Sequence, residues 1–187
     1  MRTSLAWSVV LTLSLLPAGG LCLLHHTTYY DHMIAQAAAR NGVDFYLIKA
    51  VLFEESWFRP SIRGPAGEIG LMQVSMAAAT DFAVRKGFPP LYPERLLEPE
   101  LNIEIGSWYL RQSLDRYKDS PAPALFALLR YNAGEARTDR WLQIALSEPV
   151  PPGLSKERYY LSRVDFSKTR EYVRRILQRS QSRNFWY

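Results

Sequence analysis

The sequence predicts an all-α protein built as a single domain. Its 187 residues are 48% hydrophobic and 22% charged, a balance that supports a buried core and excludes intrinsic disorder. From residue 29 onward the apolar residues recur at helical spacing, and no run of alternating β-branched residues appears. No Asn-Gly or Asp-Gly pair stands between strand-like segments, so β-hairpins are not expected.

Residues 1–22 are set apart from this domain, which we place at residues 29–180. Arg2 precedes an apolar stretch over 5–16, which ends at Pro17 and is followed by small residues. This order is typical of a secretory signal peptide cleaved after Gly20. Because apolar residues resume at 21–24, an uncleaved membrane anchor is the alternative. We therefore expect an exported protein of the periplasm or cell envelope.

Capping and turn signals divide the domain into helices. The first, over 30–40, stops at Asn41-Gly42, and Asp44 can cap a second that runs to about residue 56. A Gly/Pro loop over 59–70 precedes a helix over 76–86. After a proline-punctuated loop over 87–99, helices are predicted over 100–117, from Pro121 to 132–134, over 135–146 and over 169–178.

Several classes of function are excluded by what the sequence lacks. A single cysteine cannot form a disulfide framework or a thiolate zinc cluster. The net charge of +5 is too small and too dispersed to indicate nucleic-acid binding, although it suits an anionic polymer or surface. No phosphate loop, His-Glu-x-x-His or Gly-x-Ser-x-Gly motif is present, and the three histidines read as ordinary surface or core residues. We expect no metal and no cofactor.

The remaining chemistry is that of a carboxyl group on the second helix. Glu55 follows Ile48 by seven residues and so shares a helix face with Val51 and Leu52. Poor solvation on an apolar face raises the pKa of an acid and prepares it to donate a proton near neutral pH. Glu54 lies about 100° away around the helix. The alternative is that both glutamates are surface acids.

The chain also carries a series of short motifs in a fixed order. They are Ala50-Val51-Leu52-Phe53-Glu54-Glu55-Ser56, Gly67-Glu68-Ile69-Gly70-Leu71-Met72-Gln73, Asn102 with Gly106, Tyr109 and Leu110, Tyr131-Asn132-Ala133-Gly134, and Thr169-Arg170-Glu171-Tyr172-Val173. In this order they resemble the soluble lytic transglycosylase family, lysozyme-like enzymes of the bacterial wall, over residues 30–178. The resemblance implies a lysozyme-like fold of packed helices around a glycan-binding cleft.

The resemblance also implies an activity and a set of site residues. Glu55 would be the catalytic acid of a lytic transglycosylase, which cleaves the β-1,4 bond between N-acetylmuramic acid and N-acetylglucosamine and forms a 1,6-anhydromuramyl product. The substrate-binding residues would be Ser56, Met72, Gln73, Tyr131 and Asn132. Four of them have a simpler interpretation from the residues alone: Ser56 and Asn132 as helix caps, and Met72 and Tyr131 as core.

The sequence departs from the family pattern at four positions, two of them in the loop expected beside the active site. Gly64 stands where the family often has serine, Glu68 where it often has alanine, Met76 where it usually has proline, and Lys168 where it has an acid. Glu68 is either a solvated loop acid or a carboxylate that projects toward Glu55. The departures affect the expected substrate contacts and leave the acid in place.

Two other functions stay open at this point. One is a lysozyme-type muramidase, a hydrolase that needs a placed water and a second acid such as Glu68. The other is a non-catalytic peptidoglycan-binding protein on the same fold. Peptidoglycan strands are the expected partner of a monomer, and envelope secretion machinery is a candidate partner. The arginines of the last helix read as a solvated face, with weak binding to a membrane surface as the alternative.

Overall fold

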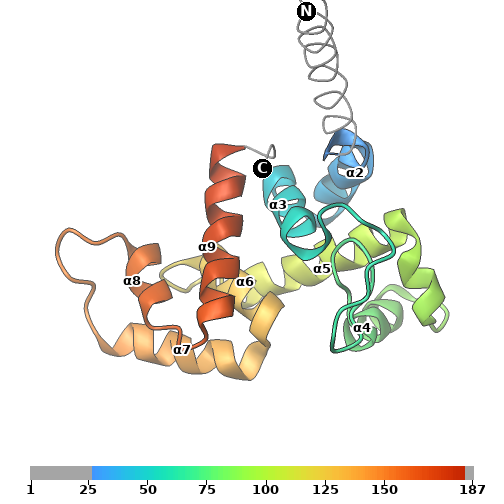
Figure 1. The fold of residues 1–187 in the computed structure, drawn as a ribbon. Helices are drawn as coiled ribbons and strands as arrows, with labels where there is room; N and C mark the ends of the chain where they lie inside the picture. The colour runs from blue at the N-terminus through green and yellow to red at the C-terminus, as the bar shows by residue number, and fades with distance from the viewer. Residues whose placement is uncertain (1–26, 184–187) are drawn as a thin grey trace, which may run out of the picture.

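The computed structural model describes residues 27–183, and this part of the chain is helical, as predicted (Figure 1). No helix within it is both long and apolar enough to cross a membrane. The expected signal or membrane-targeting segment lies outside the described residues. The helices are α2 (Asp31–Asn41), α3 (Phe45–Ser56), α4 (Met76–Lys86), the 3-10 helix η1 (Pro93–Leu97), α5 (Pro99–Arg116), α6 (Pro123–Ala133), α7 (Glu135–Ser147), α8 (Lys156–Ser162) and α9 (Ser167–Ser182).

The predicted caps set the boundaries of α2 and α3. Gly42 ends α2 in the left-handed conformation, with φ of 62°, which glycine adopts without a steric penalty. The Asp44 carboxylate then accepts a hydrogen bond of 2.9 Å from the backbone N–H of Leu47 and caps α3. A correctly started α3 fixes which face of the helix carries Glu55.

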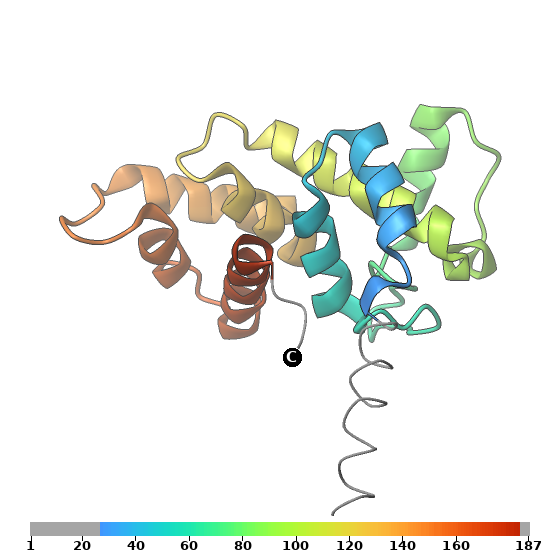
Figure 2. The same cartoon turned by 90° about the horizontal axis from the view of Figure 1, so that it is seen from above.

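The core forms around α5, which runs through the middle of the molecule (Figures 1 and 2). Helices α2, α4 and α6 pack against α5, whereas α3 packs against α9. In both views α9 stands beside α3, although 110 residues of the sequence lie between the end of α3 at Ser56 and the start of α9 at Ser167. The site therefore depends on a contact between the second and the last of the predicted helices.

The helix boundaries differ from the prediction near the C-terminus. Helix α8 was not predicted, because seven residues are too few to show a helical period. Ser155 caps it, and Tyr159, Tyr160 and Leu161 are buried. Helix α9 is longer than the predicted 169–178 and begins at Ser167. This earlier start brings Lys168 into the first turn of the helix.

Candidate active site

Glu55 lies in the last turn of α3 and is directed toward α9. Its Oε1 accepts a hydrogen bond of 2.5 Å from the hydroxyl of Tyr172, a buried residue of α9. Tyr131 of α6 is close enough for its phenol to interact electrostatically with the Glu55 carboxyl group. Three helices thus surround one carboxyl group.

This environment favours the protonated form of Glu55. Burial raises the pKa of the carboxyl group from 4.5 to about 7. The hydrogen bond from Tyr172 lowers this pKa, and the negative charges of Glu54 and Glu68 raise it, so burial outweighs the hydrogen bond. Glu55 can therefore donate a proton near neutral pH and, once ionised, take one back.

Glu54, the neighbouring acid, has a different environment. Arg175 of α9 donates to its Oε1 through Nε, at 2.8 Å, and through Nη2. Only 13% of the Glu54 side chain is exposed, so a guanidinium group holds this carboxylate. The pair joins α3 to α9 beside the catalytic position, which separates the roles of the two adjacent glutamates.

Asn102 of α5 fixes the loop that follows α3. Its buried amide nitrogen donates to the carbonyls of Ile69 and Leu96, at 2.8 and 2.7 Å, and its Oδ1 accepts from the N–H of Met72 at 2.8 Å. A side chain at Gly70 would place its Cβ 2.4 Å from the Asn102 amide nitrogen, which explains the glycine there. These hydrogen bonds therefore hold the loop that follows α3 in a fixed position against α5.

Gln73 and Met72 stabilise this loop in different ways. The Gln73 amide donates to the carbonyls of Ile62 and Gly70, at 3.2 and 2.9 Å, and its backbone has the uncommon positive φ of 47°. Met72 is fully buried, and a Cβ at Gly106 would lie 2.5 Å from its sulfur. The side chain of Met72, expected in the cleft, is therefore placed in the core.

Tyr131 and Asn132 lie at the end of α6. The Tyr131 hydroxyl donates to the backbone carbonyl of Met72 at 2.8 Å, so this backbone group helps to position the tyrosine ring. Asn132 is exposed, and its Oδ1 accepts from the Thr169 hydroxyl at 2.8 Å. Each of the two residues lines a different cavity.

Ser56 is placed differently from the expectation. Its side chain is buried, with 1% of the residue exposed, and its hydroxyl donates to the Leu52 carbonyl at 3.1 Å. The structure thus places Ser56 in the packing behind the acid, with its donor already used by the helix. This agrees with the simpler interpretation, a residue that completes the end of α3.

Glu68 is half-buried and belongs to the cleft rather than to the outer surface of the loop. One carboxylate oxygen accepts from the N–H of Ala66 at 3.1 Å. A Cβ at Gly64 would lie 2.4 Å from the same oxygen. The glutamate therefore occupies the space that a side chain at position 64 would need, and the two departures from the family pattern form one local arrangement.

Two cavities are lined by residues that interact with Glu55. One, of about 130 Å³, is lined by residues of the loop, α5 and α6, including Glu68, Gln73 and Tyr131. The other, of about 460 Å³, is lined by Asn132, Ser167, Lys168, Glu171, Tyr172 and Arg175. The first cavity thus adjoins Glu55 through Tyr131, and the second through Tyr172.

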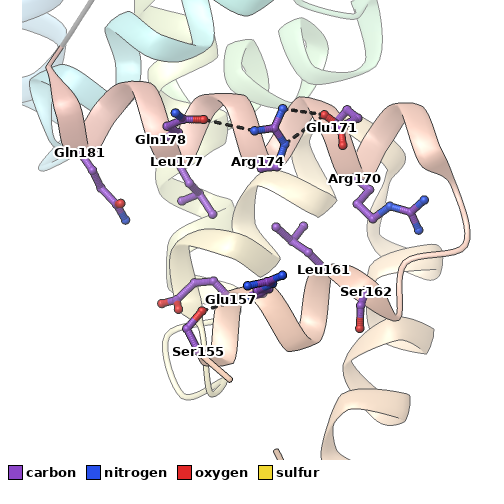
Figure 3. A pocket seen from close by; sticks show the side chains of 11 residues that line it. Ser155, Glu157, Leu161, Ser162, Arg170, Glu171, Arg174, Leu177, Gln178 and Gln181 are labelled. Atoms are coloured by element: carbon purple, nitrogen blue, oxygen red, sulfur yellow. Dashed lines mark hydrogen bonds and ion pairs between the residues drawn. The ribbon is translucent and has the colours of Figure 1, made fainter. Parts of the chain in front are cut away.

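A larger cavity of about 620 Å³ lies between α8 and α9 (Figure 3). Figure 3 shows Leu161 of α8 and Leu177 of α9 pointing into the space between the two helices, and Arg174 bonded to Glu171 and Gln178. At about 100° per residue, the α9 residues that line this cavity centre on the side of the helix roughly opposite Tyr172. The catalytic geometry, rather than cavity size, therefore locates the active site.

Sequence reasoning singled out Glu55 and its poor solvation but did not predict its hydrogen bond with Tyr172. The residue belongs to a motif that the family resemblance had identified, yet nothing local indicated its partner. Among residues 27–183, no group of three or more His, Cys, Asp or Glu residues could hold a metal ion.

Comparison with known proteins identifies relatives of this chain. A family described as "Transglycosylase SLT domain" matches residues 32–149. The soluble lytic murein transglycosylase of Salmonella typhimurium is 33% identical over 149 residues, which cover 79% of this chain and 22% of the relative. A membrane-bound lytic murein transglycosylase F from Desulfosudis oleivorans is 31% identical over 159 residues, covering 77% of this chain and 33% of the relative.

Solved structures give the same result for the fold. A complex of a 70-kDa soluble lytic transglycosylase with bulgecin A has a TM-score of 0.72 at 26% identity, covering 82% of this chain and 24% of that protein. An inactive mutant of the lytic transglycosylase Slt from Pseudomonas aeruginosa has a TM-score of 0.70 at 25% identity, covering 82% of this chain and 23% of that protein. The chain thus spans about a quarter of these longer proteins and shares a lysozyme-like catalytic domain with them.

Proposed function

Because this chain belongs to the transglycosylase SLT domain family, we propose that it is a lytic transglycosylase of peptidoglycan. Its substrate is the β-1,4 bond between N-acetylmuramic acid and N-acetylglucosamine. The observation that carries the proposal is the half-buried carboxyl group of Glu55, with a pKa raised to about 7 and with two neighbours, Tyr131 and Tyr172, that line cavities.

The reaction uses Glu55 twice. Protonated Glu55 donates its proton to the bridging oxygen as the bond from this oxygen to C1 of the muramyl residue breaks. Positive charge develops at C1, as an oxocarbenium-like species or shared with the 2-acetamido group. The Glu55 carboxylate then takes the proton of the C6 hydroxyl while O6 bonds to C1. The product is a 1,6-anhydro ring, Glu55 is protonated again, and no water is consumed.

Tyr172 prepares the acid for both steps. Its hydroxyl remains hydrogen-bonded to Oε1 and stabilises the carboxylate that forms after the first proton transfer. Burial opposes this by favouring the neutral acid. The balance keeps both protonation states accessible near pH 7, as a residue that acts first as an acid and then as a base requires.

The product decides between this reaction and hydrolysis. Muropeptides released from purified cell wall in H₂¹⁸O are identified by mass spectrometry. A lytic transglycosylase gives 1,6-anhydromuramyl ends without ¹⁸O. Reducing muramic acid ends that carry ¹⁸O would show that the chain is a hydrolase.

A muramidase-type hydrolase is the second candidate, and Glu68 is the observation that favours it. This half-buried carboxyl group lines the cavity that also contains Tyr131. A second carboxylate beside a catalytic acid can activate water, as in glycosidases that use two acids. The isotope experiment on the Glu68→Ala variant tests this role, because loss of an ¹⁸O-labelled product would identify Glu68 as the base.

The role of Glu55 is tested with a matched pair of variants. Glu55→Gln removes the proton donor and acceptor and should lower turnover by about 10⁴-fold. Glu54→Gln changes the adjacent residue in the same way and should retain most of the activity. The inactive mutant of the Pseudomonas aeruginosa relative carries the same type of substitution, glutamate to glutamine. Equal losses in the two variants would reject the assignment of Glu55 as the acid.

We also propose that the protein acts after export, in the periplasm or cell envelope. The support is the signal-like sequence over residues 1–22, either cleaved or retained as an anchor. Envelope secretion machinery is a proposed partner, and a monomer with weak association to membrane surfaces is the proposed state. Fractionation of cells that produce the full chain, compared with a chain that lacks residues 2–20, tests the export. An equal cytoplasmic level of both would refute it.

A further inference from the structure

The cavity at the start of α9 contains a positive charge that the proposed reaction does not use. Lys168 lines this cavity of about 460 Å³ together with Tyr172, the partner of Glu55. The cavity therefore adjoins the catalytic acid, and its Lys168 wall is accessible because this side chain is exposed. A substituent on the sugar held at Glu55 can extend into it.

The other charged residues of the cavity are already paired. Arg175 binds Glu54, and Glu171 accepts from Nε and Nη2 of Arg174 at 3.0 and 2.8 Å. Lys168 forms no ion pair with any acid among residues 27–183. The cavity thus carries one uncompensated positive charge.

Asn132 adds a hydrogen-bond donor to the wall of the same cavity. Its Oδ1 is occupied by the Thr169 hydroxyl, which leaves the amide nitrogen available. An ammonium group and an amide N–H together suit a carboxylate ligand. The family pattern has an acid in place of Lys168, so the charge of this wall is reversed in the present chain.

We propose that the Lys168 cavity binds a carboxylate of the peptide attached to the lactyl group of the muramyl residue. The inference rests on the proposed function and adds a specificity to it: the enzyme prefers glycan strands whose peptides carry free carboxylates. Lys168 and Asn132 contact the peptide, whereas Glu55 and Tyr172 act on the sugar. Because the lysine is exposed, water screens the ion pair and its contribution is modest.

The test compares two substrates that differ only in charge. Glycan strands with free peptide carboxylates, and the same strands after chemical amidation of these groups, are cleaved by the parent, Lys168→Ala and Lys168→Glu. Lys118→Glu is the matched control, because Lys118 is exposed, lies beyond the end of α5 and does not line the cavity. All assays are run at low ionic strength, where the interaction is screened least.

The parent should cleave free strands with a kcat/KM about fivefold higher than amidated strands, mainly through a lower KM. Lys168→Ala should abolish this preference, Lys168→Glu should reverse it, and Lys118→Glu should keep it. If Lys168 variants change kcat/KM equally on both substrates, the inference is wrong.

A third substrate distinguishes the two carboxylates that the muramyl residue can carry. Strands stripped of peptide by an amidase retain the lactyl carboxylate alone. If Lys168→Ala lowers kcat/KM on these strands only, the cavity binds the lactyl group and the assignment to the peptide is wrong.

A binding measurement tests the inference independently of the proposed function. The affinity of free and amidated strands for Glu55→Gln, with and without Lys168→Ala, is measured without turnover. If the parent cleaves no substrate, the proposed function fails, while the binding preference still tests Lys168. If cleavage occurs and the Glu55→Gln protein binds both strands equally, the function stands and the inference fails.

Discussion

Because burial disfavours the charged form of Glu55, replacing this residue with glutamine should stabilise the protein at alkaline pH. The carboxyl group has a pKa of about 7 in the folded protein and 4.5 when fully solvated. A pKa raised on folding means that the folded state holds the proton more tightly. The contribution of Glu55 to stability is therefore complete below pH 4.5 and is lost as pH rises through 7.

The magnitude follows from these two values. Each pH unit between them corresponds to about 1.36 kcal/mol, so full ionisation lowers the free energy of unfolding by roughly 3 kcal/mol. Glutamine cannot ionise and can still accept the hydrogen bond from Tyr172. We expect Glu55→Gln to exceed the parent in stability by less than about 1 kcal/mol at pH 5 and by roughly 3 kcal/mol at pH 8.

Urea unfolding of both proteins at several values between pH 5 and 8 measures this difference, provided that the m-values agree. At pH 8 the variant should also melt about 6–12 °C higher. Glu54→Gln is the control, because it weakens the ion pair to Arg175 and should destabilise the protein by up to about 1 kcal/mol. An advantage of Glu55→Gln that is constant with pH, or absent at pH 8, would refute the reasoning.

Three further variants test other parts of the site. Tyr172→Phe removes the hydrogen bond that lowers the pKa of Glu55, so the alkaline limb of the kcat/KM profile should move upward by about one to two pH units. Glu68→Ala removes a negative charge that raises this pKa, so the same limb should move toward acid by less than about one unit; an unchanged profile would show that Glu68 is an ordinary loop residue. Gly106→Ala places a Cβ 2.5 Å from the sulfur of Met72 and should cost about 1–3 kcal/mol in urea unfolding, and a neutral effect would show that the methionine can move aside.

Local sequence signals were sufficient for most of the helices. Asp44 and Gly42 act where their chemistry predicts, and the helical position of Glu55 on an apolar face agrees with the burial that raises its pKa. The helical period of α8 was undetectable because the helix has only seven residues. Helix caps and helix faces could therefore be predicted from neighbouring residues, whereas a helix as short as α8 could not.

Contacts across the chain could not be predicted in the same way. Tyr172 and Glu55 are 117 residues apart, and no local pattern relates them. The side chain of Met72 turned out to pack on Gly106 because Asn102 fixes the backbone N–H of Met72, again from a distant segment. Which face of a loop or helix meets the cleft is decided by tertiary packing, so the binding residues were harder to place than the acid.

Because α9 packs against α3 and supplies partners of the two glutamates, the environment of Glu55 is complete only after α9 has been synthesised. The acid is synthesised more than a hundred residues before Tyr172 and Arg175, and the family match itself ends at residue 149, before either of them. A nascent or clipped chain that stops there would contain the glutamate without its tyrosine or the neighbouring guanidinium. The Glu55 carboxyl group thus acquires the environment that sets its pKa only when the last helix docks.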